Sequence, residues 1–308
     1  MRVVSLLPAA TEIIGALNLI DSLVGVSHEC DYPPAANGKL RITRCVMHEA
    51  GLSSSEVDRW VRETLASTGT LYTLDEPLLR RLRPDVILTQ RLCDVCAVGY
   101  GSVAALAATL PGPPRVVNLE PSCLEDIFAN IREVAEVLEV PDRAACVITS
   151  LRERVEAVRS RAASVQSRPR CFLMEWIDPP FCSGHWGPEL VEIAGGVEPL
   201  GHKGRASTRI PWDNVLAAQP EVLVLACCGY SVARTLQDVP ILQAYPGWET
   251  LPAVQNRRVF IVDGNAYFSR PGPRLVDSLE ILAGILHPQL FEEFTLPHWG
   301  DEQVMQLS

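Results

Sequence analysis

The chain has 308 residues, enough for two domains or one large one. Its 47% hydrophobic and 21% charged residues are typical of a soluble globular protein, and no apolar run approaches the roughly 18 residues that a membrane span needs. The net charge of −10 argues against non-specific binding to nucleic acid.

The first half of the chain alternates predicted strands with predicted helices. A turn at 8–10 is expected to precede a helix that Thr11 caps, and Ser53 or Ser54 is placed to cap another helix. The predicted strands are 3–7, 23–27, 86–89 and 115–119, and the predicted helices are 11–19, 53–68, 78–82, 103–110 and 124–138.

One long helix is predicted at 142–166. Its apolar residues recur at steps of three and four, while Arg and Glu occupy the other faces. Pro169 ends it. A helix of about 24 residues is roughly 36 Å long, and we expect it to join two lobes. The apolar stripe consists of Ala144, Ile148, Leu151, Val155, Val158, Ala162 and Val165.

The second half repeats the alternation. The segments 78–90 and 214–227 share one pattern, a helix, a proline, an acidic residue and a buried strand. Alternating strands and helices predict parallel sheets, so we expect an α/β fold of two mainly parallel lobes. The predicted strands are 171–176, 222–227 and 259–262, the loops 177–186 and 263–273, and the helices 188–194, 212–218 and 274–286.

The predicted organisation has four parts. An N-terminal α/β lobe at 1–141 is followed by the interlobe helix at 142–166. A C-terminal α/β lobe at 167–288 is followed by a polar tail at 289–308 that shows no clear period.

Aromatic residues gather in the loops that follow the predicted strands. Only 6% of the chain is aromatic, so eight such residues in five loops are an enrichment. Loops after parallel strands meet at the carboxyl edge of a sheet, where ligands bind in such folds. The aromatics either plug these edges or contact a large, partly apolar ligand. They are Tyr32, Tyr100, Trp176, Phe181, Trp186, Tyr230, Tyr267 and Phe268.

Cysteines and histidines in the same loops suggest a second chemistry. His28 and Cys30, with Cys93 and Cys96, could bind zinc or iron, and His185 could add a ligand. One C-x-x-C alone is a modest signal, and it is also compatible with a redox pair or with thiols that simply pack around a pocket. A neutral histidine or a thiolate could equally reach a metal that a bound ligand carries.

No motif predicts catalysis. The chain lacks a G-x-x-x-x-G-K phosphate loop and a G-x-S-x-G elbow, so we expect a binding protein rather than an enzyme. Arg270 could pair with a phosphate or carboxylate of a ligand, or hold its own loop through a salt bridge.

The N-terminus leads directly into a predicted core strand, without a long apolar signal segment. The ten cysteines are scattered, and several fall in predicted strands and helices, which favours reduced thiols. We therefore expect a cytoplasmic protein as the sequence is written, or a periplasmic or extracellular one if a signal has been removed.

Several segments resemble one known family. The opening SLLPAATEIIGALNLIDSLVGVSHECDYP, the RPDVIL strand, the single long helix and the AGG at 194–196 are similar to the substrate-binding proteins for cobalamin and iron chelates of ABC importers, most of all to the cobalamin-binding members. The resemblance covers roughly 1–288. It implies two α/β lobes bridged by one helix, with cobalamin or a related corrinoid held between them, and an ABC transporter permease as partner. We expect a monomer.

The resemblance also implies where the ligand binds and how the protein docks. An exposed carboxylate on each lobe would contact the transporter, with Glu49 or Glu76 and Glu189 or Glu192 as the possible counterparts. Heme or an iron siderophore is the alternative ligand, and a cytoplasmic carrier or sensor the alternative role. The expected ligand-binding residues are Pro8, Ala9, His28, Tyr32, Gln90, Cys93, Cys96, Trp176, Phe181, His185, Trp186, Tyr230, Tyr267, Phe268 and Arg270.

Overall fold

A computed structural model describes residues 1–46, 51–91 and 99–307 of the chain. Its contacts divide the chain into two compact units, each described by itself below. The first unit comprises Met1–Gly51, Arg59–Pro121 and Glu125–Thr149, and the second comprises Leu52–Asp58, Ser122–Leu124 and Ser150–Ser308.

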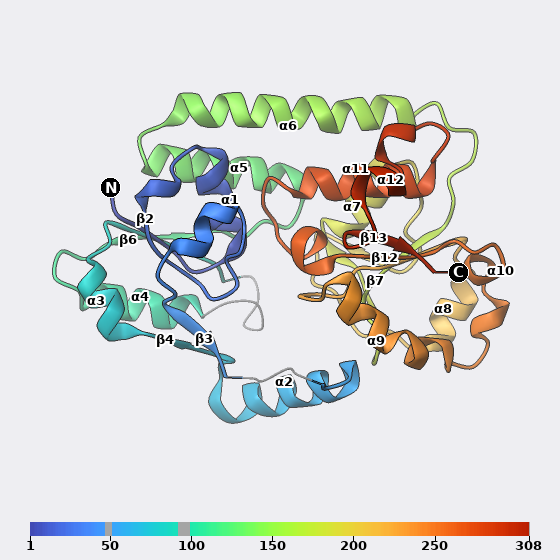
Figure 1. Ribbon diagram of the computed structural model, residues 1–308, viewed down its shortest axis with the longest axis horizontal. Coiled ribbons are helices and arrows are strands. Elements are labelled where there is room, and N and C mark those ends of the chain that lie inside the picture. Colours follow the sequence, from blue (N-terminus) through green and yellow to red (C-terminus); the bar gives the residue numbers. More distant parts are fainter. Residues whose placement is uncertain (47–50, 92–98, 308) are drawn as a thin grey trace. The chain divides into compact units, whose positions relative to one another are not determined.

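The first unit is built on a four-stranded parallel sheet (Figure 1). Every residue of β5 is buried, as expected of a strand inside a parallel sheet. The strands stand in the order β2 (Leu23–Val26), β1 (Val3–Ser5), β5 (Val86–Thr89) and β6 (Arg115–Asn118).

Helices and a small ladder complete the first unit. Leu79, Ile87 and Val103 form the centre of one core cluster between a helix layer and the sheet. A two-stranded antiparallel ladder pairs β3 (Thr43–Cys45) with β4 (Tyr72–Leu74), which the sequence patterns did not predict. The helices are α1 (Pro8–Ala16), α3 (Glu76–Leu82), α4 (Tyr100–Ala108) and α5 (Leu124–Val137).

The predicted turn at 8–10 is wrong, because α1 already begins at Pro8. Proline suits the first turn of a helix, where its missing N–H has no partner to lose. Thr11 therefore lies inside the helix instead of capping it. Its hydroxyl donates to Ser5 Oγ at 2.8 Å and to Cys30 Sγ at 3.0 Å.

Helix α2 (Ser54–Thr68) begins as predicted, with Ser53 as its cap. The Ser53 hydroxyl accepts the N–H of Glu56 at 3.4 Å, and the Glu56 carboxylate accepts the N–H of Ser53 at 2.8 Å. These reciprocal bonds form a capping box.

The long helix is α6 (Pro141–Ala162), and its boundary between units falls after Thr149. The predicted stripe is buried from Ala144 to Ala162, whereas Val165 lies beyond the helix end. In the first unit, Arg143 donates to the Leu17 carbonyl oxygen at 3.0 Å. In the second unit, Arg154 binds the carboxylates of Glu280 and Asp277, each at 2.6 Å.

The second unit is built on a five-stranded sheet with a parallel centre. β7, β11 and β12 run parallel, while β8 and β13 are antiparallel edges. This confirms the predicted mainly parallel α/β fold, and β13 comes from the segment predicted as a tail (Figure 1). The order is β13 (Val304–Gln306), β12 (Val259–Val262), β11 (Val222–Leu225), β7 (Cys171–Trp176) and β8 (Phe181–Cys182).

Short elements surround this sheet. The predicted loop at 177–186 contains β8 and β9 (Gly184–His185), which pairs with β10 (His202–Lys203). Strands of two residues are too short to show a period-two pattern, so the sequence could not separate them from loop. The helices are α7 (Gly187–Ile193), α8 (Trp212–Ala218), α9 (Val232–Gln243), α10 (Pro252–Gln255), α11 (Leu275–Leu286) and α12 (Leu296–Trp299).

Membrane insertion through a helix finds no support in the described ranges. None of the helices in them combines the length and the apolar character needed to cross a bilayer.

Candidate functional site

In the first unit, the predicted ligand residues gather at one edge of the sheet. β2, β1 and β5 are neighbouring parallel strands, so their carboxyl ends lie side by side. Pro8 and Ala9 follow β1, His28 and Tyr32 follow β2, and Gln90 follows β5. Strand order therefore brings together residues that are 80 positions apart, at the edge where ligands bind in α/β folds.

Cys30 is a structural thiol at this edge. It is fully buried, and its sulfur lies 3.0 Å from the Thr11 hydroxyl and 3.1 Å from the Ser27 hydroxyl. Arg41 fixes the same loop by donating to the Ser27 and Cys30 carbonyl oxygens. Burial raises the pKa of the Cys30 thiol, so it stays protonated and unsuited to bind a metal.

His28 lies on the same loop but contacts different groups. Its Nδ1 lies 2.7 Å from Thr43 Oγ1, and its Nε2 lies 3.1 Å from a Glu29 carboxylate oxygen, at ion-pair distance. The ring packs on Tyr72 with 5.3 Å between centroids. Burial acts to lower the pKa of His28, but Cys45 and Glu29 beside it outweigh burial and raise that pKa to about 9. His28 is therefore an imidazolium at neutral pH.

The structure does not assemble the predicted zinc or iron site from what it describes. In the ranges 1–46, 51–91 and 99–307, no group of three His, Cys, Asp or Glu side chains is placed to hold a metal ion. His28 is protonated and Cys30 is buried among hydroxyls. Cys93 and Cys96 lie outside the described residues.

In the second unit, the predicted residues again collect at a carboxyl edge. Trp176 ends β7, Tyr230 follows β11, and Tyr267, Phe268 and Arg270 follow β12. These three strands are neighbours in the parallel part of the sheet. In both units, therefore, predicted ligand residues lie at the carboxyl ends of neighbouring parallel strands.

Trp176 and Tyr230 form an aromatic pair with 4.7 Å between ring centroids. Arg234 lies over the Tyr230 ring at 4.1 Å and pairs with Asp238 at 3.0 Å. The Trp176 indole N–H donates to the Ser54 carbonyl oxygen at 3.1 Å. Arg234 was not predicted, although its position four residues after Tyr230, next to a predicted site residue, was a readable signal.

Several predicted ligand aromatics are packed into the protein. Trp186 is 8% exposed and donates its indole N–H to the Phe268 carbonyl oxygen at 2.9 Å. Tyr267 is 7% exposed, and Trp299 meets it edge-on at 5.9 Å. Arg270 is buried as well and donates to Asn265 Oδ1 at 2.9 Å. These side chains build the edge, and Trp299 belongs to a segment that we did not expect to take part.

Three predicted ligand aromatics are not fully buried. Tyr32 in the first unit is 42% exposed. Trp176 and Phe181 in the second unit are half-buried, and the Arg209 guanidinium lies 5.6 Å from the Phe181 ring centroid. Arg209 also pairs with Asp58. Tyr32, Trp176 and Phe181 are thus the predicted aromatics best able to meet a ligand without prior rearrangement.

His185 has an unusual backbone conformation. Its φ of +49° is in the left-handed region, which a non-glycine residue enters at a cost. Backbone bonds hold it there, from its own N–H to the Arg205 carbonyl oxygen at 2.6 Å and from the Gly204 N–H to its carbonyl oxygen at 2.9 Å. The ring stacks on Trp186 with 5.5 Å between centroids.

The electrostatics of His185 differ from those of His28. Burial lowers the pKa of His185, so its imidazole is neutral at pH 7. Its Nδ1 is enclosed and meets no hydrogen-bond partner among the described residues. A neutral imidazole held in a strained backbone can offer a lone pair to a metal.

The predicted docking carboxylates differ in availability. Glu76 is exposed at the start of α3, and Glu192 is exposed with Lys203 at 2.6 Å. Glu189 instead accepts the N–H of Leu124 at 2.8 Å. Glu49 lies outside the described residues.

A family model described as periplasmic binding protein matches residues 3–266. The match therefore includes the parallel strands of both sheets and the long helix, and it ends before Tyr267, Phe268 and Arg270 and before β13.

Curated relatives of similar length carry one functional name. A vitamin B12-binding protein of Vibrio cholerae is 24% identical over 290 residues, which cover 91% of this chain and 86% of the relative. A vitamin B12-binding protein of Yersinia pestis is 29% identical over 238 residues, which cover 73% of this chain and 69% of the relative.

Solved structures share the fold. The periplasmic vitamin B12-binding protein BtuF of Vibrio cholerae matches with a TM-score of 0.67 and 24% identity, over 92% of this chain and 96% of that one. The periplasmic heme-binding protein RhuT of Roseiflexus sp. RS-1 matches with a TM-score of 0.67 and 21% identity, over 96% of this chain and 99% of that one.

Proposed function

Because the chain belongs to the periplasmic binding protein family, we propose that it binds a corrinoid of the cobalamin class as the substrate-binding protein of an ABC importer. The observation that carries this proposal is the resemblance to a vitamin B12-binding protein over 91% of the chain. Membership of a family of binding proteins agrees with the expectation that the protein is not an enzyme.

The chemistry of the two sheet edges supports a large, partly apolar ligand. A corrinoid has broad faces that aromatic rings can cover and amide groups that need hydrogen bonds. Tyr32 and Phe181 present accessible ring surface, and Gln90 follows a buried strand. We propose that these residues contact the corrinoid, while the buried Trp186 and Tyr267 shape the edge behind them.

We further propose that His185 binds the cobalt of the ligand. Its neutral imidazole, its strained backbone and its Trp186 stack support this role. A ligand with an exchangeable axial water or hydroxide would accept the imidazole, whereas cyanide would compete with it. The site would therefore prefer aquocobalamin to cyanocobalamin.

The partner and location follow the same proposal. A permease of an ABC importer would receive the ligand, with Glu76 and Glu192 as the carboxylates that dock, since both are exposed. Both solved relatives are periplasmic proteins, which supports an exported protein, whereas the cytoplasmic alternative stays a prediction.

An absorption-monitored titration of the protein with aquocobalamin and cyanocobalamin tests the ligand. We expect saturable one-to-one binding of both, with a change of the corrinoid spectrum for aquocobalamin alone. Binding of both forms without a spectral change would support the corrinoid as ligand and contradict the proposal that His185 binds the cobalt.

Hemin serves as the opposing ligand in the same assay. Saturable binding of hemin, with no binding of either cobalamin, would contradict the corrinoid proposal and favour a heme-binding protein. A tenfold preference for cobalamin, about 1.4 kcal/mol, would support it.

A further inference from the structure

The segment 289–307 forms one wall of a partly open cavity on the second unit. The cavity has a volume of about 260 Å³, larger than the roughly 150 Å³ cavity that accommodates benzene in an engineered protein. None of the predicted ligand residues lines it, although Trp299, which does, meets the Tyr267 ring edge-on. Its lining is Arg258, Phe260, Ile281, Gly284, Ile285, Pro288, Phe294, Thr295, Leu296, Pro297, Trp299, Val304 and Gln306.

The wall formed by the C-terminal segment is held in place. Phe291 is fully buried, and Arg161 lies over its ring at 4.3 Å. A Cβ added at Gly284 would come within 2.0 Å of the Phe294 carbonyl oxygen, so the segment approaches α11 as closely as glycine permits. The Trp299 indole N–H donates to the same carbonyl oxygen at 3.0 Å. The cavity therefore has fixed walls.

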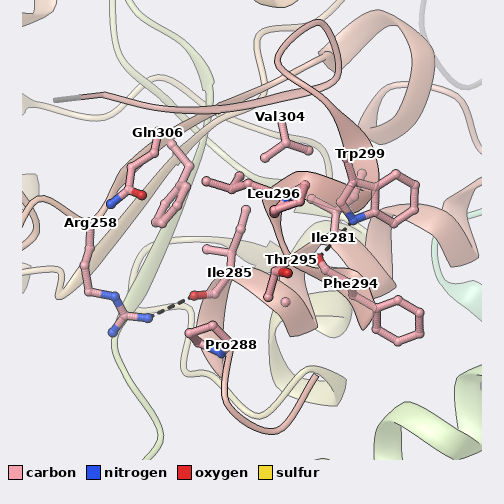
Figure 2. Close-up of a pocket in the computed structure, with 13 residues that line it drawn as sticks. Arg258, Ile281, Ile285, Pro288, Phe294, Thr295, Leu296, Trp299, Val304 and Gln306 are labelled. Carbon is pink, nitrogen blue, oxygen red and sulfur yellow. Dashed lines mark hydrogen bonds between the residues drawn. The ribbon is translucent and has the colours of Figure 1, made fainter. Parts of the chain in front are cut away.

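Most of this lining is apolar, and its one charged side chain lies at one end. Figure 2 shows Arg258 and Gln306 at one side of the cavity and Trp299 and Phe294 at the other. Of the described residues that line the cavity, Arg258 alone carries a charge. An apolar body with an anionic end would match this distribution.

Arg258 has donors to spare. Its Nη2 donates to the Ile285 and Leu286 carbonyl oxygens, each at 3.0 Å, which fixes the guanidinium at the end of α11 (Figure 2). Its Nε and Nη1 have no hydrogen-bond partner within the described part of the chain, and no carboxylate there lies at ion-pair distance from it. The Glu221 carboxylate acts on Arg258 electrostatically but makes no hydrogen bond or ion pair with it, so the Nε and Nη1 donors stay available to an anion.

We propose that this cavity binds a small apolar carboxylate, with the carboxylate on Arg258 and the hydrocarbon body against Phe260, Ile281 and Leu296. A guanidinium can hold a carboxylate through two parallel hydrogen bonds. The volume suits a short aliphatic or single-ring acid and is too small for a corrinoid. The site is therefore separate from the proposed corrinoid site, and its test needs no corrinoid.

Calorimetric titration with three six-carbon probes tests the site on the full chain. Hexanoate carries the carboxylate, while hexanol and hexylamine keep the hydrocarbon and change the end group. We expect saturable one-to-one binding of hexanoate, about tenfold weaker binding of hexanol and none of hexylamine.

Adjacent arginines supply a matched pair of variants. Arg258→Gln removes the lining charge, and Arg257→Gln makes the same change of net charge at the exposed neighbour, which does not line the cavity. We expect Arg258→Gln to weaken hexanoate binding about tenfold and to leave hexanol binding as it was. Arg257→Gln should bind both probes like the unmodified protein.

A variant that fills the cavity provides a test that does not depend on the stability of the Arg258→Gln variant. Leu296→Trp enlarges a partly exposed lining residue and should abolish hexanoate binding while the thermal midpoint stays close to that of the unmodified protein. Equal binding of hexanoate by this variant would overturn the proposed location. Equal binding of hexanoate and hexanol, or no saturable binding of hexanoate at millimolar concentration, would overturn the proposed ligand.

Discussion

His28 and His185 make an informative comparison. His28 follows β2 in the first unit, and His185 ends β9 in the second unit. We predicted ligand contacts for both. The pKa of His28 is raised to about 9 by Cys45 and Glu29 against the effect of burial, whereas burial lowers the pKa of His185. At neutral pH one is a cation and the other a neutral base.

The comparison shows that the neighbouring groups, more than the residue type, determine the protonation state of each histidine. Each histidine has one ring nitrogen that makes no hydrogen bond among the described residues. That nitrogen of His28 lies 3.1 Å from a Glu29 carboxylate oxygen, and Thr43 occupies the other. His185 has no carboxylate at ion-pair distance within the described residues, and its backbone is held at positive φ, which is why we propose His185 and not His28 as the ligand of a metal.

The sharpest test replaces each histidine by glutamine. We expect His185→Gln to lose the spectral change with aquocobalamin and to weaken its binding on the order of a hundredfold, about 2.7 kcal/mol, because a coordination bond is lost. His28→Gln should keep the spectral change. Absorption titration measures both. The reverse result, with the change lost only in His28→Gln, would exchange the roles of the two residues.

The second test distinguishes His28 from His185 by the pH dependence of the free energy of unfolding. A raised pKa means that the folded state binds the proton more tightly than the unfolded state, whose histidine pKa is about 6.5. The stabilisation by His28 is then fully present below pH 6.5 and is lost as the pH rises through 9. We expect a loss of roughly 2 kcal/mol over this range.

Urea unfolding at pH 6 and pH 9.5 measures this loss, with His28→Gln as the comparison. The variant should be less stable at pH 6 and should change less between the two pH values. A wild type and a variant with parallel pH profiles would show that His28 is not the protonated group. His185, whose pKa is lowered, should instead contribute stability that is lost as the pH falls below 6.5.

The backbone strain at His185 should have a smaller effect on stability, and relieving it should stabilise the protein. Glycine adopts a φ of +49° without the cost that a side chain meets there. We expect His185→Gly to be about 1 kcal/mol more stable than His185→Ala, since both lose the ring and only alanine keeps the strain. Chemical denaturation of the two variants provides the difference. Equal stability would mean that the left-handed conformation stores no strain.

The smallest expected effect concerns Cys30. Because this thiol is protonated and bonded to Thr11 and Ser27, Cys30→Ala should leave the zinc and iron content of the purified protein unchanged. Elemental analysis of both proteins checks this. A stoichiometric metal that disappears in the variant would restore Cys30 as a ligand.

Local patterns were enough for much of the fold. Three elements have the predicted bounds: the buried strand 86–89, the strand 171–176 and the helix 212–218. Apolar runs and the spacing of apolar residues indicate such elements directly. The stripe of α6 was predicted residue by residue up to Ala162. Parallel topology followed from the alternation of elements.

The sequence also placed the candidate residues in loops at the carboxyl edges of both sheets, since loops after parallel strands must meet there. Their contact with a ligand stays a prediction. Trp186, Tyr267 and Arg270 are buried and hydrogen-bonded or packed within the protein, which the sequence patterns did not indicate. Trp299 was overlooked because nothing local connects it to Tyr267.

The sequence by itself thus determined the fold class, the central strands of both sheets and most of the longer helices, because these depend on neighbours within a few positions of the chain. Tertiary structure decided the protonation of His28 and His185, the burial of Cys30 and the conversion of the predicted tail into β13 and a cavity wall. These properties arise from groups far apart in the chain. Burial and hydrogen bonding change a pKa or a packing role only once the fold has brought such groups into contact.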